Sequence, residues 1–300
     1  MVLVAILLAL PAAAVEEQHV QGNYTDGKNA TAKVVAEGGG NYRVLLNLNG
    51  KEITLRGKTS EKGADPTFEG TAQGSFSDGK IVLTRSSAPN RSLTLTRSET
   101  PSPTLGAKPP RGAIVLMDGT NLDEWETSPL KWHLRGDGSA EVANPELISK
   151  REFGDHKLHI EFRTPFMPSH RGQARGNSGV YLHGVYEVQV LDSFGLPPAD
   201  NDCGGIYKVA VPTANMCLPP LEWQTYDITF RAARFDNTGK KTENARITVN
   251  HNGVTIHDDI ELPSITGGAM RDTEHSTGPL KLQHHHDAVR YRNVWAVPLD

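Results

Sequence analysis

Cysteine is scarce in this chain of 300 residues, which has only Cys203 and Cys217. Two cysteines cannot build a dense disulfide framework, and the histidines are distant in sequence, so a cysteine-based zinc site has little support. Basic residues are not in excess either, because 31 Lys and Arg stand against 35 Asp and Glu, a formal net charge of −4. Binding to nucleic-acid phosphates needs a basic field, so this composition argues against a nucleic-acid partner.

The chain also lacks the short motifs of several large enzyme classes. It contains no Walker loop, HExxH pair, GxSxG elbow or dinucleotide fingerprint. These absences argue against NTPases, zincins, serine hydrolases and nicotinamide enzymes.

Long apolar runs are confined to the N-terminus. Residues 1–14 are apolar, but a membrane-spanning helix needs about 20 such residues. The run ends in Ala12-Ala13-Ala14, the small-residue pattern of a signal-peptidase site. We therefore expect residues 1–15 to be a signal peptide, the protein to be exported to the periplasm or secreted, and no stable membrane span.

Turn-forming residues are abundant, with 29 Gly and 19 Pro, which favours many short strands over long helices. In residues 18–98, short alternating runs are separated by turns such as Asn49-Gly50 and Asp78-Gly79, whose residue types suit hairpins. We interpret this stretch as a small antiparallel β accessory domain. Residues 99–112 are rich in proline and show no alternation, so their composition predicts a linker.

Residues 113–300 carry a stronger β pattern. Polar and apolar residues alternate over 157–163, 186–190 and 226–230, and Asn252-Gly253 predicts a hairpin turn. No long segment has a convincing helical period. We therefore expect an all-β fold, with two packed antiparallel sheets forming a jelly-roll sandwich after the small β domain.

The segment 186–192 holds the strongest candidate for a site. The two-residue period of a strand places Glu187 and Gln189 on one face. A carboxylate beside an amide provides a general base, Glu187, and a group that orients a sugar, Gln189. The alternative is that this face is the solvated side of an edge strand.

Two further clusters supply candidates. Arg175 and Asn177 lie among glycines that would let a substrate approach the backbone, although a tight turn explains the same residues. In the polar run 283–287, Gln283 is a candidate for sugar binding and His285 for proton transfer.

A divalent metal is a second interpretation of that run. His284 and His286 would share one face of an extended segment, and Asp287 follows them. Chance clustering of histidines in a polar turn is the alternative, so the sequence leaves the metal open.

Three more side chains are candidates for substrate binding. Tyr207 and Trp223 could stack on sugar rings, although packing in the core is the commoner use of such residues. Arg292 could hold an anionic intermediate or pair with a carboxylate. In an exported protein we also expect Cys203 and Cys217 to form a disulfide, and two unpaired buried thiols are the alternative.

The order of motifs in the second half resembles the 3-keto-disaccharide hydrolase domain family. The resemblance is carried by residues 115–125, 153–163, 176–181, 186–193, 203–207, 222–226, 283–285 and 292–295. It implies a fold similar to concanavalin A-like glucanases and lectins. Gln189 stands where those glucanases carry an acid, which argues against the carboxylate pair of a retaining glycosidase.

The resemblance implies an enzyme that cleaves 3-keto-glycosides or 3-keto-disaccharides. The ketone acidifies the C2 proton, a base removes it, the C1 aglycone is eliminated and water adds, so the net reaction is hydrolysis. The implied partner is an oligosaccharide or glycoside. Two alternatives remain: a lectin-like carbohydrate-binding module without catalysis, and an ordinary glucan glycosidase.

Overall fold

The structure, a computed structural model, describes residues 17–60, 65–85, 88–126 and 132–299. The chain divides into two compact units, Met1–Thr100 with Met167–Arg171, and Pro101–Phe166 with Gly172–Asp300. The segment 1–15, expected to be a signal peptide, lies outside the described residues. Across the described ranges, every helix is too short or too polar to span a membrane.

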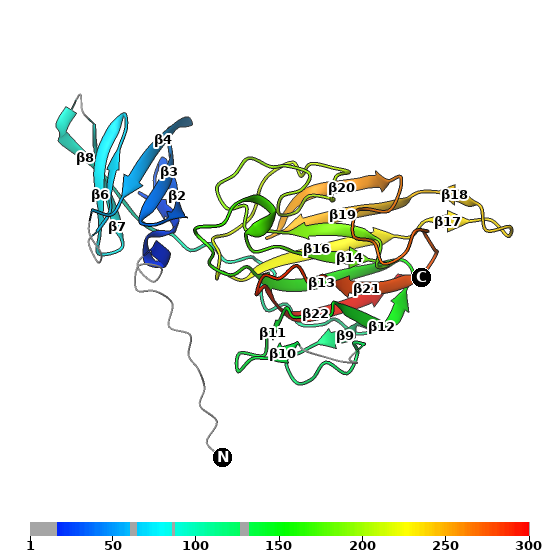
Figure 1. The fold of residues 1–300 in the computed structure, drawn as a ribbon. Coiled ribbons are helices and arrows are strands. Elements are labelled where there is room, and N and C mark those ends of the chain that lie inside the picture. Colours follow the sequence, from blue (N-terminus) through cyan, green and yellow to red (C-terminus); the bar gives the residue numbers. More distant parts are fainter. Residues whose placement is uncertain (1–16, 61–64, 86–87, 127–131, 300) are drawn as a thin grey trace, which may run out of the picture. The chain divides into compact units, whose positions relative to one another are not determined.

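The first unit is a closed barrel in which each strand pairs with the next and β1 pairs with β8 (Figure 1). Its strands are β1 (Gly22–Thr25), β2 (Ala30–Gly38), β3 (Asn41–Leu48), β4 (Lys51–Lys58), β5 (Thr67–Glu69), β6 (Ala72–Ser77), β7 (Lys80–Arg85) and β8 (Ala88–Arg97).

Two features of the sequence account for this barrel: turn residues between its strands and alternating apolar residues that fill its interior. Asn49-Gly50 joins β3 to β4 and Asp78-Gly79 joins β6 to β7, and all four residues have positive φ. Both central residues of a type I′ turn need that conformation, which Asn, Asp and Gly tolerate best. Alternate side chains such as Val34, Val44 and Leu55 are fully buried, so the interior is a packed core.

The second unit is built from two antiparallel sheets. The large sheet has the order β10-β11-β22-β13-β16-β19-β20, with β9 also paired to β22. Its strands are β9 (Ile114–Met117), β10 (His133–Leu134), β11 (Ala140–Glu141), β13 (His156–Arg163), β16 (Gln224–Arg231), β19 (Ala245–His251), β20 (Val254–Leu262) and β22 (Arg290–Pro298).

The small sheet has the order β12-β21-β14-β15. Its strands are β12 (Leu147–Phe153), β14 (Ser178–Leu182), β15 (Tyr186–Val190) and β21 (Gly278–Leu282). A two-stranded ribbon, β17 (Arg234–Phe235) and β18 (Lys241–Glu243), and the short helix η1 (Gly172–Ala174) complete the unit.

The two sheets pack face to face around an aromatic core. Phe230 of the large sheet packs against Tyr186 of the small one, with ring centroids 5.5 Å apart. Two tyrosine hydroxyls also tie the layers together, because Tyr226 donates to the Gln189 carbonyl (2.7 Å) and Tyr291 lies 2.8 Å from the Ser178 hydroxyl. This sandwich confirms the all-β fold predicted from the alternating pattern.

The two cysteines correct the sequence-based expectation, because Cys203 and Cys217 are buried free thiols and form no disulfide. The Cys203 sulfur lies 3.2 Å from the Tyr226 hydroxyl, and the Cys217 sulfur lies 3.5 Å from the Leu191 carbonyl. The thiols thus serve as small core side chains with weak hydrogen bonds.

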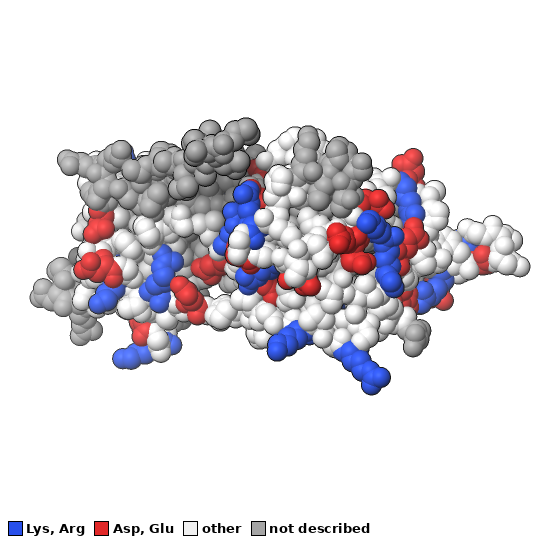
Figure 2. Space-filling view, turned by 90° about the horizontal axis from the view of Figure 1, so that it is seen from below, with Lys and Arg blue, Asp and Glu red and all other residues white. Residues whose placement is uncertain are grey.

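Charged side chains are mixed in sign on the face shown in Figure 2, where acidic and basic residues alternate without a continuous block of either. This surface agrees with the nearly balanced composition, 31 basic against 35 acidic residues.

Candidate functional site

A polar face covers the side of the small sheet that points away from the core. The strand register pairs Gly179 with Gln189 and Tyr181 with Glu187, and it pairs Tyr181 with Lys281 of β21. Because side chains alternate along a strand, these residues share one face, while Tyr186 and Val188 point into the sandwich. We call the set Asn177, Gly179, Tyr181, Glu187, Gln189, Lys281 and Gln283 the polar face.

Glu187 supplies the carboxyl of the polar face, and its pKa is strongly perturbed. It is 3% exposed, and Gln189 is 1% exposed, so this face of β15 is not a solvated edge. Burial raises the pKa of Glu187 to about 7, although Tyr181 and Lys281 favour its charged form. A carboxyl that titrates near neutrality can accept and release a proton in the working pH range.

The Glu187 carboxyl lies over Gly179, where the strand has no side chain. A Cβ at Gly179 would come within 3.0 Å of both the Glu187 carboxyl and the Tyr181 ring. The Glu187 main-chain N–H donates to the Thr266 hydroxyl (2.9 Å), which fixes the strand beneath the carboxyl. Glycine at 179 therefore provides the room that the carboxyl occupies.

Lys281 places a positive charge on the same face. Its side chain is 1% exposed, and its ammonium lies 3.8 Å from the centroid of the Tyr181 ring. The ammonium donates to the Gly268 carbonyl (2.6 Å) and to Glu146 (3.3 Å). Burial lowers the pKa of Lys281, with Glu146 and Glu187 opposing the shift. A desolvated ammonium of this kind is suited to stabilising negative charge that develops close to it.

Asn177, Gln189 and Gln283 offer acceptor oxygens on this face. The side-chain carbonyl oxygen of each of these three residues is buried and has no hydrogen-bond partner. The Gln283 amide nitrogen donates to the Tyr181 hydroxyl at 3.2 Å. Sugar hydroxyls are donors that match such oxygens.

Two other predicted residues lie at the margin of this face. Tyr207 is half-buried, and its main-chain N–H donates to the Glu187 carbonyl at 3.2 Å. His285 follows Gln283 by two residues and is exposed, with its ring 6.3 Å from that of His286. The structure therefore brings Glu187, Gln189, Asn177, Gln283 and Tyr207 together and leaves His285 towards solvent.

The histidine run does not form a metal centre with its neighbours. The rings of His284 and His286 are 4.7 Å apart, but Asp287 accepts a hydrogen bond from the Asn177 main-chain N–H (2.8 Å). In the part of the chain that the structure describes, no three His, Cys, Asp or Glu side chains gather closely enough to hold an ion.

Arg175 has a structural partner. Its guanidinium donates to the Asp192 carboxylate at 2.6 Å, and the two side chains are 7% and 0% exposed. Burial raises the pKa of Asp192, and Arg175 opposes this shift. Removal of either partner of an ion pair this deep would leave the other as an uncompensated buried charge, so the pair is part of the folded loop that enters β14.

Trp223 and Arg292 lie elsewhere, on the outer face of the large sheet. The Arg292 guanidinium stacks 4.0 Å from the centroid of the Trp223 ring and donates to Glu161 at 2.7 Å. Glu161 alternates with the core residues Ile160 and Phe162 of β13, so it points away from the sandwich. These two predicted binding residues are thus separated from Glu187 by both sheets.

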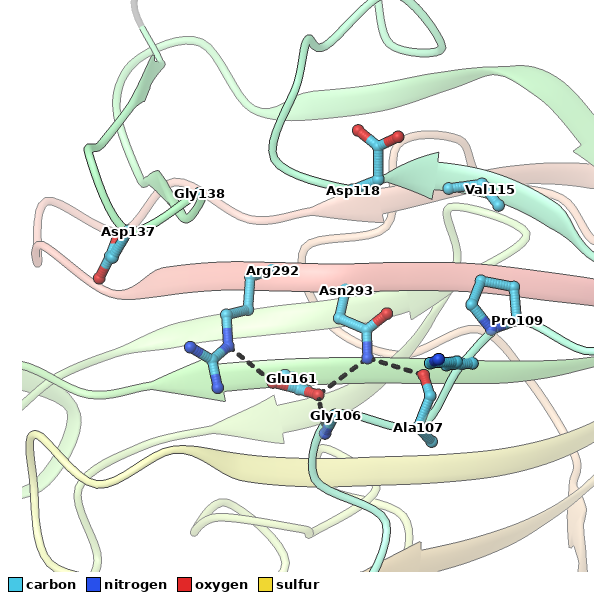
Figure 3. A pocket seen from close by; sticks show the side chains of 11 residues that line it. Gly106, Ala107, Pro109, Val115, Asp118, Asp137, Gly138, Glu161, Arg292 and Asn293 are labelled. Atoms are coloured by element: carbon cyan, nitrogen blue, oxygen red, sulfur yellow. Dashed lines mark hydrogen bonds and ion pairs between the residues drawn. The ribbon is translucent and has the colours of Figure 1, made fainter.

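A pocket of about 330 Å³ adjoins Arg292 on this outer face (Figure 3). Asp118, Asp137, Asn293 and Glu161 contribute its polar lining. Glu161 is fully engaged, because it accepts hydrogen bonds from the Gly106 N–H (2.6 Å), Asn293 (2.8 Å) and Arg292 (2.7 Å). Burial opposes these bonds, but together with His159 they lower the pKa of Glu161 to about 2. The Glu161 carboxylate is therefore satisfied by groups of the protein itself.

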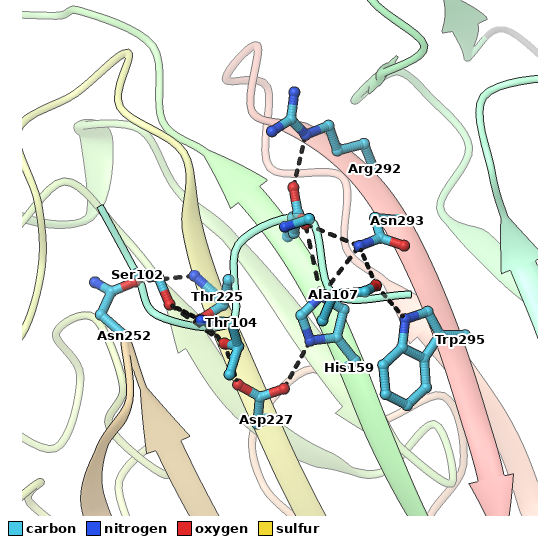
Figure 4. A network of polar contacts seen from close by, with 12 residues as sticks. Ser102, Thr104, Ala107, His159, Thr225, Asp227, Asn252, Arg292, Asn293 and Trp295 are labelled. Carbon is cyan, nitrogen blue, oxygen red and sulfur yellow. Dashed lines mark hydrogen bonds and ion pairs between the residues drawn. The ribbon is translucent and has the colours of Figure 1, made fainter. Parts of the chain in front are cut away.

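Residues 101–109, which the composition places in a linker, lie across this outer face as an ordered strap (Figure 4). Ser102 contacts the Thr225 hydroxyl at 2.6 Å, and Thr104 donates to Asp227 at 2.6 Å. Beneath the strap, His159 contacts Asp227 at 2.6 Å. Burial lowers the pKa of His159, but its two carboxylate neighbours reverse the shift and raise it.

Sequence reasoning missed Lys281 and Tyr181 as residues of the polar face. Leu280-Lys281-Leu282 is an ordinary alternating strand pattern, in which a lysine is normally solvated. Its burial follows from the pairing of β21 with β14, which are distant in sequence. The residues around Lys281 in the sequence therefore contain no pattern from which its burial could be predicted.

The second unit matches a known family. Residues 112–297 match the model of the 3-keto-alpha-glucoside-1,2-lyase-like domain. A solved structure from Parabacteroides distasonis ATCC 8503, provisionally described as a glycosyl hydrolase, is 35% identical with a TM-score of 0.58; 63% of this chain and 85% of that chain are covered. A second such structure from the same organism is 18% identical with a TM-score of 0.49; 63% and 94% are covered.

None of the functionally curated proteins matches the chain. The family match and the first structural relative support a carbohydrate-active enzyme that acts on glycosides. Because the matched domain spans more than half of the chain, the protein belongs to the 3-keto-alpha-glucoside-1,2-lyase-like family, in agreement with the motifs of its sequence.

Proposed function

We propose that this protein cleaves the glycosidic bond of 3-keto-glycosides. The observation that carries the proposal is Glu187, a carboxyl whose pKa burial raises to about 7 and which shares the polar face with the Lys281 ammonium. A general base works best when its pKa lies near the working pH. The family match supports the same substrate class.

The chemistry begins at C2, where the neighbouring ketone makes the proton acidic. Glu187 takes this proton, and the C–H electrons form an enolate whose oxygen the Lys281 ammonium stabilises. When the carbonyl re-forms, the C1–O bond breaks and the aglycone oxygen leaves with its electron pair. His285, two residues beyond Gln283, is the proposed proton donor to that oxygen. Addition of water to the unsaturated sugar completes a net hydrolysis.

A comparison of native and 3-oxidised glucosides that carry the same aglycone tests the function. We expect the full chain to release the aglycone from the 3-keto substrate alone, and to exchange the C2 proton with solvent deuterium. Parallel reactions with a chelator show whether a divalent metal contributes. Equal release from the native glucoside would contradict C2 chemistry and favour an ordinary glycosidase. Binding without release would favour a lectin-like module.

Gly179→Ala is expected to reduce kcat about a hundredfold, because a Cβ there displaces the Glu187 carboxyl, and misplacement of a catalytic group by about 1 Å has that effect. Steady-state kinetics on the 3-keto substrate measure it. Gly136→Ala is the matched control, because a Cβ at Gly136 has no atom within 4 Å. A kcat of Gly179→Ala equal to that of the control would show that the carboxyl position does not matter.

A further inference from the structure

Two amides of the polar face are held by a third, Gln173, on the helix η1. The Asn177 side-chain N–H₂ donates to the Gln173 main-chain oxygen (2.8 Å) and side-chain oxygen (3.2 Å). The Gln189 N–H₂ donates to the same side-chain oxygen of Gln173 at 2.9 Å. One glutamine oxygen therefore receives both neighbouring amides.

These contacts fix which way each amide points. The Gln173 N–H₂ donates to the Asn201 carbonyl at 2.7 Å, so the Gln173 side-chain oxygen must face Asn177 and Gln189. A flip of either neighbour would bring two oxygens together without a proton between them. The arrangement thus leaves the Asn177 and Gln189 oxygens unpaired, in side chains that are 2% and 1% exposed.

Buried acceptors without partners are costly, and a bound donor removes that cost. A cation is the less suitable partner, because the Lys281 ammonium already occupies this face and Asn177 and Gln189 carry no formal charge. Hydroxyl groups of a sugar are neutral donors of the right kind. By donor and acceptor type, each of these two oxygens therefore matches a sugar hydroxyl, and we assign them to hydroxyls outside the reacting positions C1 to C3.

We propose that Gln173 is a positioning residue that presents the Asn177 and Gln189 oxygens as an acceptor pair for sugar hydroxyls, which makes the site selective for substrates that keep them. This inference rests on the proposed function for the identity of the ligand as a glycoside. The geometry itself rests on the three amides and the Asn201 carbonyl.

The effect is measured on 3-keto-glycosides and their 4-deoxy and 6-deoxy analogues. For the wild-type chain we expect at least one deoxy analogue to lose about 10- to 100-fold in kcat/KM, the usual effect of leaving a buried acceptor unpaired. We call the ratio of kcat/KM for the full substrate to that for a deoxy analogue the deoxy penalty. In Gln173→Leu the Asn177 and Gln189 amides are free to turn, so KM for the full substrate should rise and the deoxy penalty should fall towards 1. Gln173→Glu keeps an acceptor for both amides but loses the N–H that donates to the Asn201 carbonyl, so it should retain only part of the penalty.

A binding measurement separates failure of this inference from failure of the proposed function. Calorimetric titration of native glycosides and their deoxy analogues into Glu187→Gln, with and without Gln173→Leu, needs no turnover. Loss of the deoxy penalty in the double variant supports the acceptor pair even if the reaction proves different. An unchanged penalty, or no binding of any glycoside, overturns it even if turnover stands. Gln73→Leu, at an exposed glutamine of the barrel, is the control, and the melting temperature of each variant checks its folding.

Discussion

Glu187→Gln is expected to lower kcat by about 10²- to 10⁴-fold, because it removes the general base while keeping the shape of the side chain. In the wild-type chain kcat/KM should rise with pH through the pKa of about 7, since only the charged carboxyl accepts the C2 proton. Rate profiles from pH 5 to 9 measure both effects. Glu126→Gln, at an exposed carboxyl, is the matched control.

The same substitution should stabilise the protein in alkaline solution. The pKa of Glu187 is raised in the folded chain, so the folded state binds a proton that the unfolded state releases above pH 4.5, and stability falls as pH rises towards 7. A shift of this size corresponds to about 3 kcal/mol. Glu187→Gln should therefore melt above wild type at pH 8 and close to it at pH 4.5. If Glu187→Gln shows this melting shift but turns over substrate as fast as wild type, Glu187 is buried as described but has no catalytic role.

Arg175→Met is expected to destabilise the fold by about 3–5 kcal/mol, because it leaves the Asp192 carboxylate buried without its partner. Without Arg175 the pKa of Asp192 rises further, so the folded state holds a proton that the unfolded state loses. The loss of unfolding free energy in Arg175→Met should be larger at pH 8 than at pH 5, where protonation of the Asp192 carboxyl reduces it. Urea unfolding at the two pH values measures this difference.

A double variant identifies the source of that loss. Arg175→Met with Asp192→Leu removes both charges and should recover part of the stability. If Arg175→Met instead melts like wild type and raises KM, Arg175 binds substrate, as its position among glycines suggested from the sequence.

The contrast between Glu187 and Trp223 shows how far sequence alone could predict the site. Strand alternation is local, so it placed Glu187 and Gln189 on one face, and the register of β15 with β14 agrees. Which sheet a residue joins depends on distant pairing. Trp223 and Arg292 have chemistry suited to sugars, yet their strands or loops belong to the large sheet. Residue type suggested binding, but only the pairing of strands decides location.

The hairpin turns and Gln173 of η1 also differ in how far the local sequence predicts them. Asn49-Gly50 and Asn252-Gly253 encode their turns within two residues, and the strands that they join pair as expected. Gln173 carries no such signal, because its role depends on side chains that β14, β15 and the Asn201 loop bring to it. Local rules predicted elements, whereas the contacts that complete the site are tertiary.

Because of the strap, the compact unit that contains the sandwich begins earlier in the chain than the family match does. Family similarity begins at residue 112, but the compact unit begins at Pro101. A shortened chain that starts at 112 would lack two hydrogen bonds, from the Thr104 hydroxyl to Asp227 and from the Gly106 N–H to Glu161, so each carboxylate would lose a donor. A gene fragment intended to yield the isolated sandwich should therefore begin at codon 101 or earlier.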